Sequence, residues 1–351
     1  MQKGLVSVLI PCYNGEKLIF RLLDSLLQQD YPYLEIIIVD DGSTDKTAEL
    51  VLSYKKIFEK KGILLRYIYQ ENGGLPSAIN NGLKYVNGEY LMWPDCDDWY
   101  NTPKAISTFV NVLKDLPKEY AEVRCIPTYI DEHSLQPVQE ICFHENDFEP
   151  NQFIKCLYDD GFIWGAGNYI LRMEAFDRVN PQRDIYVEKD AGQNRQMHLP
   201  VLYSYKVHTI KESLHNVLVR AESHSRGQYK TYSQIILRLN AYESVCLGTL
   251  NKIREMPINE KVAYTEAIRR KNELQRFIIA LNWRQYKDAL KSRSILKKEK
   301  INIEKRYYRI IFKYGISFVT LFLLNELLII VKRTKKISRQ ILQKSKSFGK
   351  N

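Results

Sequence analysis

Three aspartates that follow a short apolar segment are the residues best suited to chemistry in this chain. Asp95, Asp97 and Asp98 come directly after residues 90–93, whose apolar side chains predict a buried strand. Residues i and i+2 of an extended segment point to the same side, so Asp95 and Asp97 can converge. Two carboxylates on one side suit Mg²⁺ or Mn²⁺, ions that usually also bind phosphate oxygens. An acidic surface turn is the alternative interpretation.

Four apolar segments and the helical patterns between them must position these acids. The predicted strands span residues 6–10, 35–39, 65–69 and 90–93, and the predicted helices span residues 17–29, 46–60 and 76–86. Such alternation with short turns is typical of an α/β fold with a parallel sheet. In sheets of this kind, ligands bind beyond the carboxyl ends of the strands.

Polar or aromatic side chains follow the carboxyl end of each predicted strand. In chain order they are Tyr13 and Asn14, Asp40 and Asp41, Asn72, and then Asp95 and Asp97. We therefore expect one rim of the sheet to bind a ligand.

Residues 11–17 contain a single glycine and the chain has no P-loop motif, which argues against a dinucleotide site or a P-loop. A metal would then neutralise phosphates, Tyr13 can stack on a base, and Asp40 or Asp41 can accept from a base N–H.

Four motifs in this order resemble the family 2 glycosyltransferases, which have the GT-A fold. They are VSVLIPCYN at residues 6–14, VDDGSTD at 39–45, NGG at 72–74 and DCDD at 95–98. The resemblance implies a mixed, mostly parallel sheet flanked by helices. It also implies a nucleotide-sugar donor, usually a uridine diphosphate (UDP) sugar, and transfer with inversion at the anomeric carbon.

The same resemblance assigns roles to the rim residues. Pro11 and Tyr13 would frame the uracil, and Asp41 would accept from its N3–H. Asp97 would ligate the metal that bridges the diphosphate. The donor-binding residues implied are Pro11, Tyr13, Asp40, Asp41, Asn72 and Asp95.

Inverting transfer needs a base that takes the proton of the acceptor hydroxyl. Many members of the family carry this base in a Gly-Glu-Asp segment, whereas the matching stretch here is Gly192-Gln193-Asn194. Neither amide side chain can act as a base. We therefore expect Asp190, or alternatively Glu188, to be the catalytic carboxylate.

The acceptor side and a third metal ligand are predicted from later segments. Trp164, Gln193 and Asn194 are expected to bind the acceptor, although the turn around Trp164 can equally be a packing turn in which glycines permit close approach. His224 is expected as a further metal ligand beside Asp97. An ordinary surface histidine is the alternative.

Charge is distributed unevenly along the 351 residues. From Lys291 onward seventeen Lys and Arg face three acids, a local net charge of +14, which leaves −3 of the total +11 for residues 1–290. This argues against a nucleic-acid-binding groove in the main domain.

The six cysteines have no C-x-x-C pair and no secretory signal is visible, so we expect reduced thiols and a cytoplasmic protein.

The basic C-terminal segment predicts attachment to a membrane. Its most apolar window, residues 314–331, is interrupted by Asn325 and Glu326. This pattern favours an interfacial helix on the anionic inner face of the cell membrane, with a helix buried in the protein or in a dimer as the alternative. The expected domains are a GT-A domain at 1–230, a helical extension at 231–300 and a membrane-associating tail at 301–351.

Together these observations predict an inverting glycosyltransferase that uses a UDP-sugar and Mg²⁺ or Mn²⁺. Its acceptor would be a saccharide or a lipid-linked glycan in surface polysaccharide synthesis. The alternative is a catalytically weakened relative that binds a nucleotide sugar or glycan as a partner subunit, an interpretation that Gln193 and Asn194 keep open. A nucleotidyltransferase would need a glycine- and arginine-rich first loop, which residues 11–17 lack.

Overall fold

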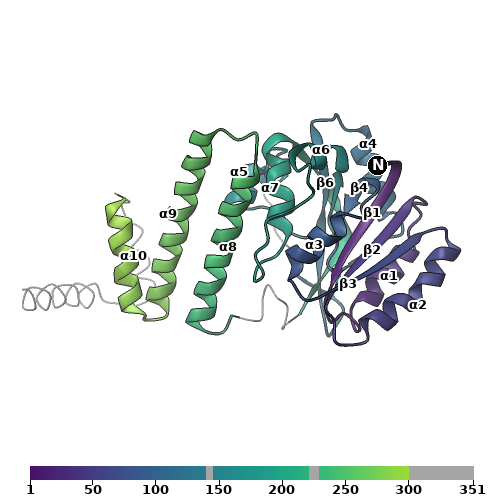
Figure 1. Cartoon of the computed structure of the whole chain (residues 1–351), viewed down its shortest axis with the longest axis horizontal. Helices are drawn as coiled ribbons and strands as arrows, with labels where there is room; N and C mark the ends of the chain where they lie inside the picture. Colours follow the sequence, from purple (N-terminus) through teal and green to yellow (C-terminus); the bar gives the residue numbers. More distant parts are fainter. Residues whose placement is uncertain (140–144, 221–228, 300–351) are drawn as a thin grey trace, which may run out of the picture. The chain divides into compact units, whose positions relative to one another are not determined.

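The computed structural model describes residues 1–139, 145–220 and 229–299, and these fall into two compact units divided between Asn272 and Glu273. The first unit contains all the strands found among these described residues (Figure 1). The strands are β1 (Gln2–Cys12), β2 (Leu34–Asp41), β3 (Leu64–Gln70), β4 (Gly88–Met92), β5 (Trp99–Tyr100), β6 (Tyr120–Asp131), β7 (Pro137–Gln139), β8 (Tyr169–Arg172) and β9 (Lys206–Val219).

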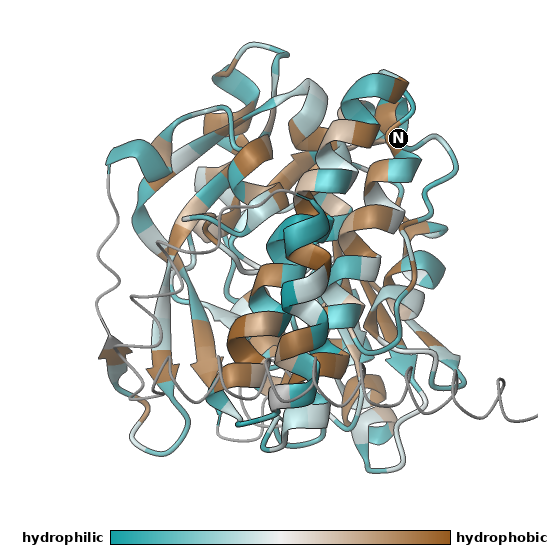
Figure 2. Ribbon diagram, turned by 90° about the vertical axis from the view of Figure 1, so that its left-hand side faces the viewer, coloured by the Kyte–Doolittle hydropathy of each residue, from teal (hydrophilic) through white to brown (hydrophobic). Residues whose placement is uncertain are grey.

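Ten α-helices and one 3₁₀ helix occur among the described residues. They are α1 (Ile19–Leu27), α2 (Thr47–Lys60), α3 (Leu75–Leu83), α4 (Ala105–Asp115), η1 (Glu145–Phe148), α5 (Phe153–Tyr158), α6 (Met173–Val179), α7 (Asn194–Ser204), α8 (Tyr232–Lys252), α9 (Ile258–Asn282) and α10 (Tyr286–Lys298). The four strands and three helices predicted for residues 6–93 are all present. Hydrophobic and hydrophilic residues alternate along the helices (Figure 2), as expected for helices with one buried face.

The strands form one mixed, mostly parallel sheet, which confirms the predicted fold class. Its order is β3-β2-β1-β4-β8-β6-β9-β5, with β7 paired to β6. β1 is parallel to β2 and to β4, and β2 is parallel to β3, whereas β8 is antiparallel to both β4 and β6. Every residue of β2 is buried, because helices cover both faces of the sheet at this strand.

Alternate residues of the central strands enter two separate hydrophobic cores. Val8 and Ile10 of β1 pack with α1, α2 and α4, whereas Leu9 packs with α3, α6 and α7. Figure 1 shows α1 and α2 on one face of the sheet and α3 on the other. This double coverage holds the strand ends in a fixed register, with Cys12 beside Asp40 and Asp41 beside Gln70.

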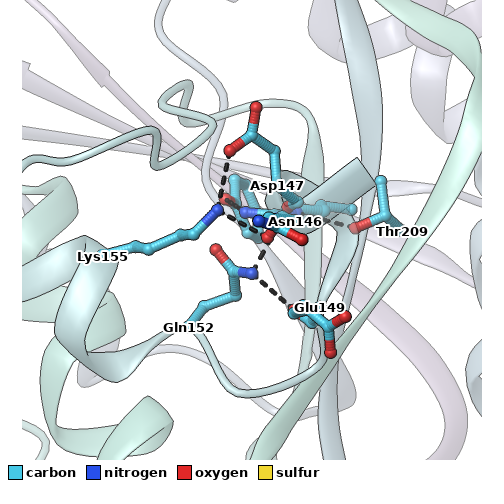
Figure 3. A network of polar contacts seen from close by, with 8 residues as sticks. Asn146, Asp147, Glu149, Gln152, Lys155 and Thr209 are labelled. Carbon is cyan, nitrogen blue, oxygen red and sulfur yellow. Dashed lines mark hydrogen bonds and ion pairs between the residues drawn. The ribbon is translucent and has the colours of Figure 1, made fainter. Parts of the chain in front are cut away.

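A polar network fixes the segment that leads into α5. Lys155 Nζ donates to Asp147 Oδ1 at 2.7 Å, and Gln152 Nε2 donates to the Asp147 carbonyl at 3.3 Å (Figure 3). The fully buried Arg124 of β6 donates from Nε to Thr209 Oγ1 of β9 at 3.0 Å and from Nη2 to the Asp147 carbonyl. The segment is thereby tied to the β6–β9 half of the sheet.

His215 of β9 makes stability depend on pH. Its side chain is fully buried, neither ring nitrogen has a hydrogen-bond partner among the described residues, and burial lowers its pKa to about 3. In the unfolded state this histidine is protonated near pH 6.5, whereas in the folded state it stays neutral at that pH. The free energy of unfolding therefore decreases as the pH falls below 6.5. Between pH 7 and pH 5 this histidine alone is expected to lower the free energy of unfolding by about 2 kcal/mol.

Urea unfolding of wild type, His215→Leu and His133→Leu at pH 7 and pH 5 measures this effect. The control His133 is exposed, with 84% of its side chain accessible. His215→Leu should lose the acid sensitivity and His133→Leu should keep it. Equal sensitivity in all three proteins would contradict the assignment.

Most of the predictions for the C-terminal segment concern residues outside the described ranges. Of the second unit, the structure describes the end of α9 and helix α10. The predicted tail, residues 301–351, and His224 lie outside the described residues. None of the described helices is both long enough and apolar enough to cross a membrane.

Candidate active site

The first two loops of the rim are joined by hydrogen bonds. Asn14, in the left-handed region at φ 50°, donates its N–H to Ser43 Oγ at 2.9 Å and accepts from the Thr44 N–H at 2.9 Å. The Gly15 N–H donates to Thr47 Oγ1 at 2.8 Å. These bonds fix the loop that carries Tyr13, whose side chain is exposed and open to a stacking partner.

Asp40 is turned into the protein. It is 1% exposed, and its carboxylate accepts from Tyr67 OH at 2.5 Å and from the Ser43 N–H at 2.8 Å. Burial, together with the hydrogen bond to Asp40, raises the pKa of Tyr67. Asp40 therefore braces the loop that follows β2.

Asp41 clamps the Asn72-Gly73-Gly74 turn. Its Oδ1 accepts from Gln70 Nε2 at 2.7 Å and from the Gly73 N–H at 2.9 Å. Its Oδ2 accepts from the Gly74 N–H at 2.9 Å, and Asn72 Nδ2 donates to the Asp41 carbonyl at 2.9 Å. The second and third strands of the rim are thus locked together through one carboxylate.

Gly74 brings a distant segment to this clamp. It has φ 86°, and a Cβ built on it would lie 3.0 Å from the Lys189 carbonyl oxygen. Only glycine accommodates both the backbone conformation and this close approach. The chain around Asp190 and Glu188 therefore lies against the turn that Asp41 clamps. Asp190 is exposed and Glu188 is half-buried.

Asp97 is paired with an arginine. Its Oδ2 accepts from Arg220 Nη2 at 2.5 Å and from Nε at 3.0 Å, and only 16% of the Asp97 side chain is exposed. The pairing follows from the sheet: β5 starts just after Asp97 and runs antiparallel to β9, with Trp99 beside Asn216. The same register lets buried Asp98 accept from the Leu218 N–H at 2.9 Å.

Asp95 receives a hydrogen bond from Gln193. The Gln193 side chain is 1% exposed and donates from Nε2 to Asp95 Oδ1 at 3.0 Å. Burial, and then the charge of Asp97, raises the pKa of Asp95 to about 7, against the opposing effect of Gln193. Burial likewise raises the pKa of Asp98. A carboxylate whose pKa is raised by burial and by a neighbouring carboxylate marks a place suited to a cation.

The three predicted acceptor residues differ in their surroundings. Asn194 Oδ1 accepts from Trp93 Nε1 at 3.2 Å, so Asn194 and Gln193 both face the end of β4. Trp164 instead donates to Asp159 and has the Arg195 guanidinium 5.1 Å from its ring centroid. The turn after Trp164 is tight, since a Cβ on Gly167 would lie 2.1 Å from His215 Nε2.

Comparison with known proteins identifies the domain built on this rim. Residues 7–179 match the family described as "Glycosyl transferase family 2". The chain carries a family 2 glycosyltransferase domain. An uncharacterized glycosyltransferase of Rickettsia typhi is 43% identical to it over 133 residues, which are 37% of this chain and 39% of that protein. An uncharacterized glycosyltransferase of Bacillus subtilis, EpsJ, is 32% identical over 180 residues, half of each protein.

The fold of the family 2 domain is also found in a solved structure. The crystal structure of S. aureus TarS 1-349 in complex with UDP-GlcNAc superposes with a TM-score of 0.57 at 18% identity, covering 82% of this chain and 79% of that one. This likeness confirms the GT-A-like fold. The chain spans about two fifths to half of the length of the curated relatives named above.

The carboxylate oxygens at this rim of the family 2 domain suit a divalent cation that also binds substrate phosphates. Among residues 1–139, 145–220 and 229–299, no three His, Cys, Asp or Glu side chains are grouped to hold an ion by themselves. Mg²⁺ in nucleotide sites needs only one or two carboxylates, because substrate phosphates supply other ligands. Asp97 and Asp95 meet this requirement, and the guanidinium of Arg220 already lies where positive charge is favoured.

Sequence reasoning missed two contacts of this site. Arg220 is 123 residues away from Asp97 in the chain, and Gln193, which is expected at the acceptor side, also contacts Asp95, 98 residues away. The only sequence signal for Arg220 is its position directly after an apolar strand. For Gln193 the signal is its place in the segment that matches Gly-Glu-Asp.

Proposed function

We propose that this protein transfers a sugar, with inversion, from a UDP-sugar to a saccharide or lipid-linked acceptor in surface polysaccharide synthesis. The observation that carries the proposal is the convergence on one rim of the Asp41 clamp, the Asp95–Gln193 contact and the Asp97–Arg220 pair. The family 2 domain supports the reaction class. The UDP-GlcNAc complex of TarS, a protein of the same fold, supports a UDP-sugar donor.

The donor would lie across the first three strand ends. Tyr13 stacks on the uracil beside Pro11, and Asp41 accepts from N3–H through the carboxylate that already holds Gly73 and Gly74. Asp40 supports this role by bracing the loop, and Asn72 keeps the turn closed. Asp95, at the end of β4, would then lie near the ribose.

Asp97 and Asp95 would hold Mg²⁺ or Mn²⁺ against the diphosphate. When bound, this ion stabilises the negative charge of the leaving UDP. Arg220 is positioned to exchange its bond to Asp97 for a bond to a phosphate oxygen, since guanidinium groups bind both anions well. Gln193 orients the Asp95 carboxylate through its 3.0 Å hydrogen bond. His224 stays a proposed further ligand.

Asp190 is the proposed general base, with Glu188 as the alternative. The approach of Lys189 to Gly74 supports a position at the rim. Asp190→Asn should lower turnover about 100-fold with little change in UDP affinity, because a base acts only on the acceptor proton. The matched variant Glu188→Gln should retain most activity. Steady-state kinetics of both variants tests this assignment. A large loss of turnover in Glu188→Gln and a small one in Asp190→Asn would instead identify Glu188 as the base.

Release of UDP from a panel of UDP-sugars tests the proposed function. The full chain is incubated with UDP-glucose, UDP-galactose, UDP-GlcNAc or UDP-GalNAc, with Mn²⁺ or with a chelator. We expect metal-dependent UDP release with at least one donor. Tight UDP binding without turnover of any donor would favour the alternative, a weakened partner subunit, for which the buried amide of Gln193 in place of a carboxylate is the specific observation.

We further propose that residues 1–230 form the catalytic domain, that 231–300 form a helical extension, and that residues 301–351 attach the protein to the inner face of the cell membrane. The support for attachment is the +14 net charge of the sequence from Lys291 onward. The protein should float with vesicles that contain phosphatidylglycerol but not with pure phosphatidylcholine. Binding should weaken in 0.5 M NaCl because salt screens surface charge. Equal flotation with both vesicles would contradict an electrostatic anchor.

A further inference from the structure

A cavity of about 210 Å³ lies between the segment that precedes α7 and helix α8, apart from the rim residues described above. Most of its lining residues carry groups that form hydrogen bonds without a net charge. They include Asn180, Gln182, Tyr186, Gln196, Thr249 and Asn251. Amide and hydroxyl groups can donate and accept hydrogen bonds, so the lining suits a ligand with matching groups.

Two buried polar atoms that belong to lining residues of this cavity have no partner among the described residues. Gln196 is 1% exposed, and its Nε2 donates to the carbonyls of Gly192 at 2.7 Å and Tyr186 at 3.4 Å. These two bonds fix the orientation of the amide, so the atom left without a partner is Oε1. Thr249 is also 1% exposed, and its Oγ1 has no partner either.

The unpartnered atoms define the chemistry of the missing group. An amide oxygen only accepts, so the ligand must donate a hydrogen bond to Gln196 Oε1. Carboxylates and the dianions of phosphate monoesters have no hydrogen to donate, and the inorganic phosphate dianion has one, whereas a sugar ring offers several hydroxyl donors. Thr249 Oγ1 can donate or accept, and a ring hydroxyl meets either need. The requirement therefore selects a hydroxyl-rich ligand over a simple anion.

The size of the cavity agrees with this selection. Two cations, Lys252 and Arg254, are among the lining residues, and Lys252 is paired with the Asp184 carboxylate, which weakens its pull on an anion. Tyr186 is held by a 2.9 Å hydrogen bond between its hydroxyl and Ser244 Oγ, which leaves its ring as a fixed apolar wall. The volume is below the range of about 300–1,000 Å³ typical of drug-sized ligands, which suits one sugar ring and not a nucleotide.

We propose that this cavity binds one sugar unit of a glycan, at a second saccharide site apart from the donor rim. The inference rests on the proposed function for its source of ligand, since the glycan acceptor is the chain that would supply the sugar unit. Gln196 also connects the two places: it holds the Gly192 carbonyl, and the next residue, Gln193, donates to Asp95. A sugar bound here would lie behind the segment that carries the proposed base.

Binding of methyl β-D-glucopyranoside and methyl N-acetyl-β-D-glucosaminide to the full chain tests the site, with inorganic phosphate as the comparison probe. Thr249→Val removes the hydroxyl at nearly constant volume, and Thr108→Val on α4 is the matched control. By saturation-transfer NMR titration, Thr249→Val should weaken glycoside binding about fivefold, the effect of one hydrogen bond. Thr108→Val should not change it, and phosphate should not compete.

A second variant guards against a folding defect in the first. Asn251 is exposed at the edge of the cavity, so Asn251→Ala should weaken glycoside binding without disturbing the core. No glycoside binding to wild type, equal binding by the Thr249→Val and Thr108→Val proteins, or a crystal structure with glycoside that shows ordered water only in the cavity would each overturn the proposal.

UDP release, measured in parallel, separates this proposal from the proposed function. If glycoside binding depends on Thr249 but the protein releases no UDP, the proposed function is wrong and the cavity site is supported. Turnover without such binding would do the reverse.

Discussion

Replacing Asp97 with alanine is expected to abolish metal-dependent binding of UDP and to lower turnover about 1,000-fold, the scale of the several kcal/mol that a bound metal contributes to the transition state. Asp97 is the carboxylate of the rim that already binds a cationic group, Arg220. Its removal takes away a ligand of the ion that would bind the diphosphate. Isothermal titration of UDP with and without Mn²⁺ measures the first effect, and UDP release measures the second.

The matched control for Asp97→Ala is Asp115→Ala, at the end of α4. It removes one carboxylate from the surface and should leave both measurements unchanged. Arg220→Met is informative as well, because it frees Asp97 from its ion pair. If Asp97→Ala binds UDP with the same dependence on Mn²⁺ as wild type, the metal assignment is wrong.

Asp41→Ala is expected to lower the free energy of unfolding by about 4 kcal/mol and to weaken UDP binding about 100-fold. The carboxylate accepts from Gln70 and from the N–H groups of Gly73 and Gly74, and it is 4% exposed. Hydrogen bonds to a charged group contribute about 1.5–3 kcal/mol each. The loss of three such bonds is partly offset because water can form hydrogen bonds with the freed N–H groups in the variant. Urea unfolding and UDP titration measure the two effects.

Asp24→Ala on α1 serves as the control for Asp41→Ala. Asp24 accepts one hydrogen bond, from the Tyr54 hydroxyl at 2.8 Å at an exposed position, so its removal should cost little stability. If the Asp41→Ala protein is as stable as Asp24→Ala and binds UDP with the affinity of wild type, the proposed role of Asp41 in stability and in UDP binding is wrong.

Local patterns predicted the first half of the fold well. The apolar run at residues 35–39 is β2, and it is buried throughout because helices cover both faces of the sheet. Asp40, Asp41 and Asn72 lie at adjoining strand ends because parallel strands bring their carboxyl ends to one edge. This part of the site follows from sequence order and from the rule that places ligands at that edge.

The remaining contacts depend on strand pairings that sequence order does not reveal. Arg220 reaches Asp97 only because β5 pairs with β9, and β9 also pairs with β6, 86 residues earlier in the Tyr120–Lys206 register. The role of Asp40 could not be foreseen either, because its partner, the Tyr67 hydroxyl, belongs to the neighbouring strand. Long-range pairings of this kind decide which contacts each of the two adjacent aspartates makes.

A crystal structure of the full chain with UDP and Mn²⁺ tests the central claim most directly. We predict one ion bound between the Asp97 carboxylate and the diphosphate, with uracil beside Tyr13 and Asp41 and with Arg220 moved from Asp97 to a phosphate oxygen. UDP bound elsewhere, or bound at the rim while Asp97 stays paired with Arg220 and no ion is present, would contradict it.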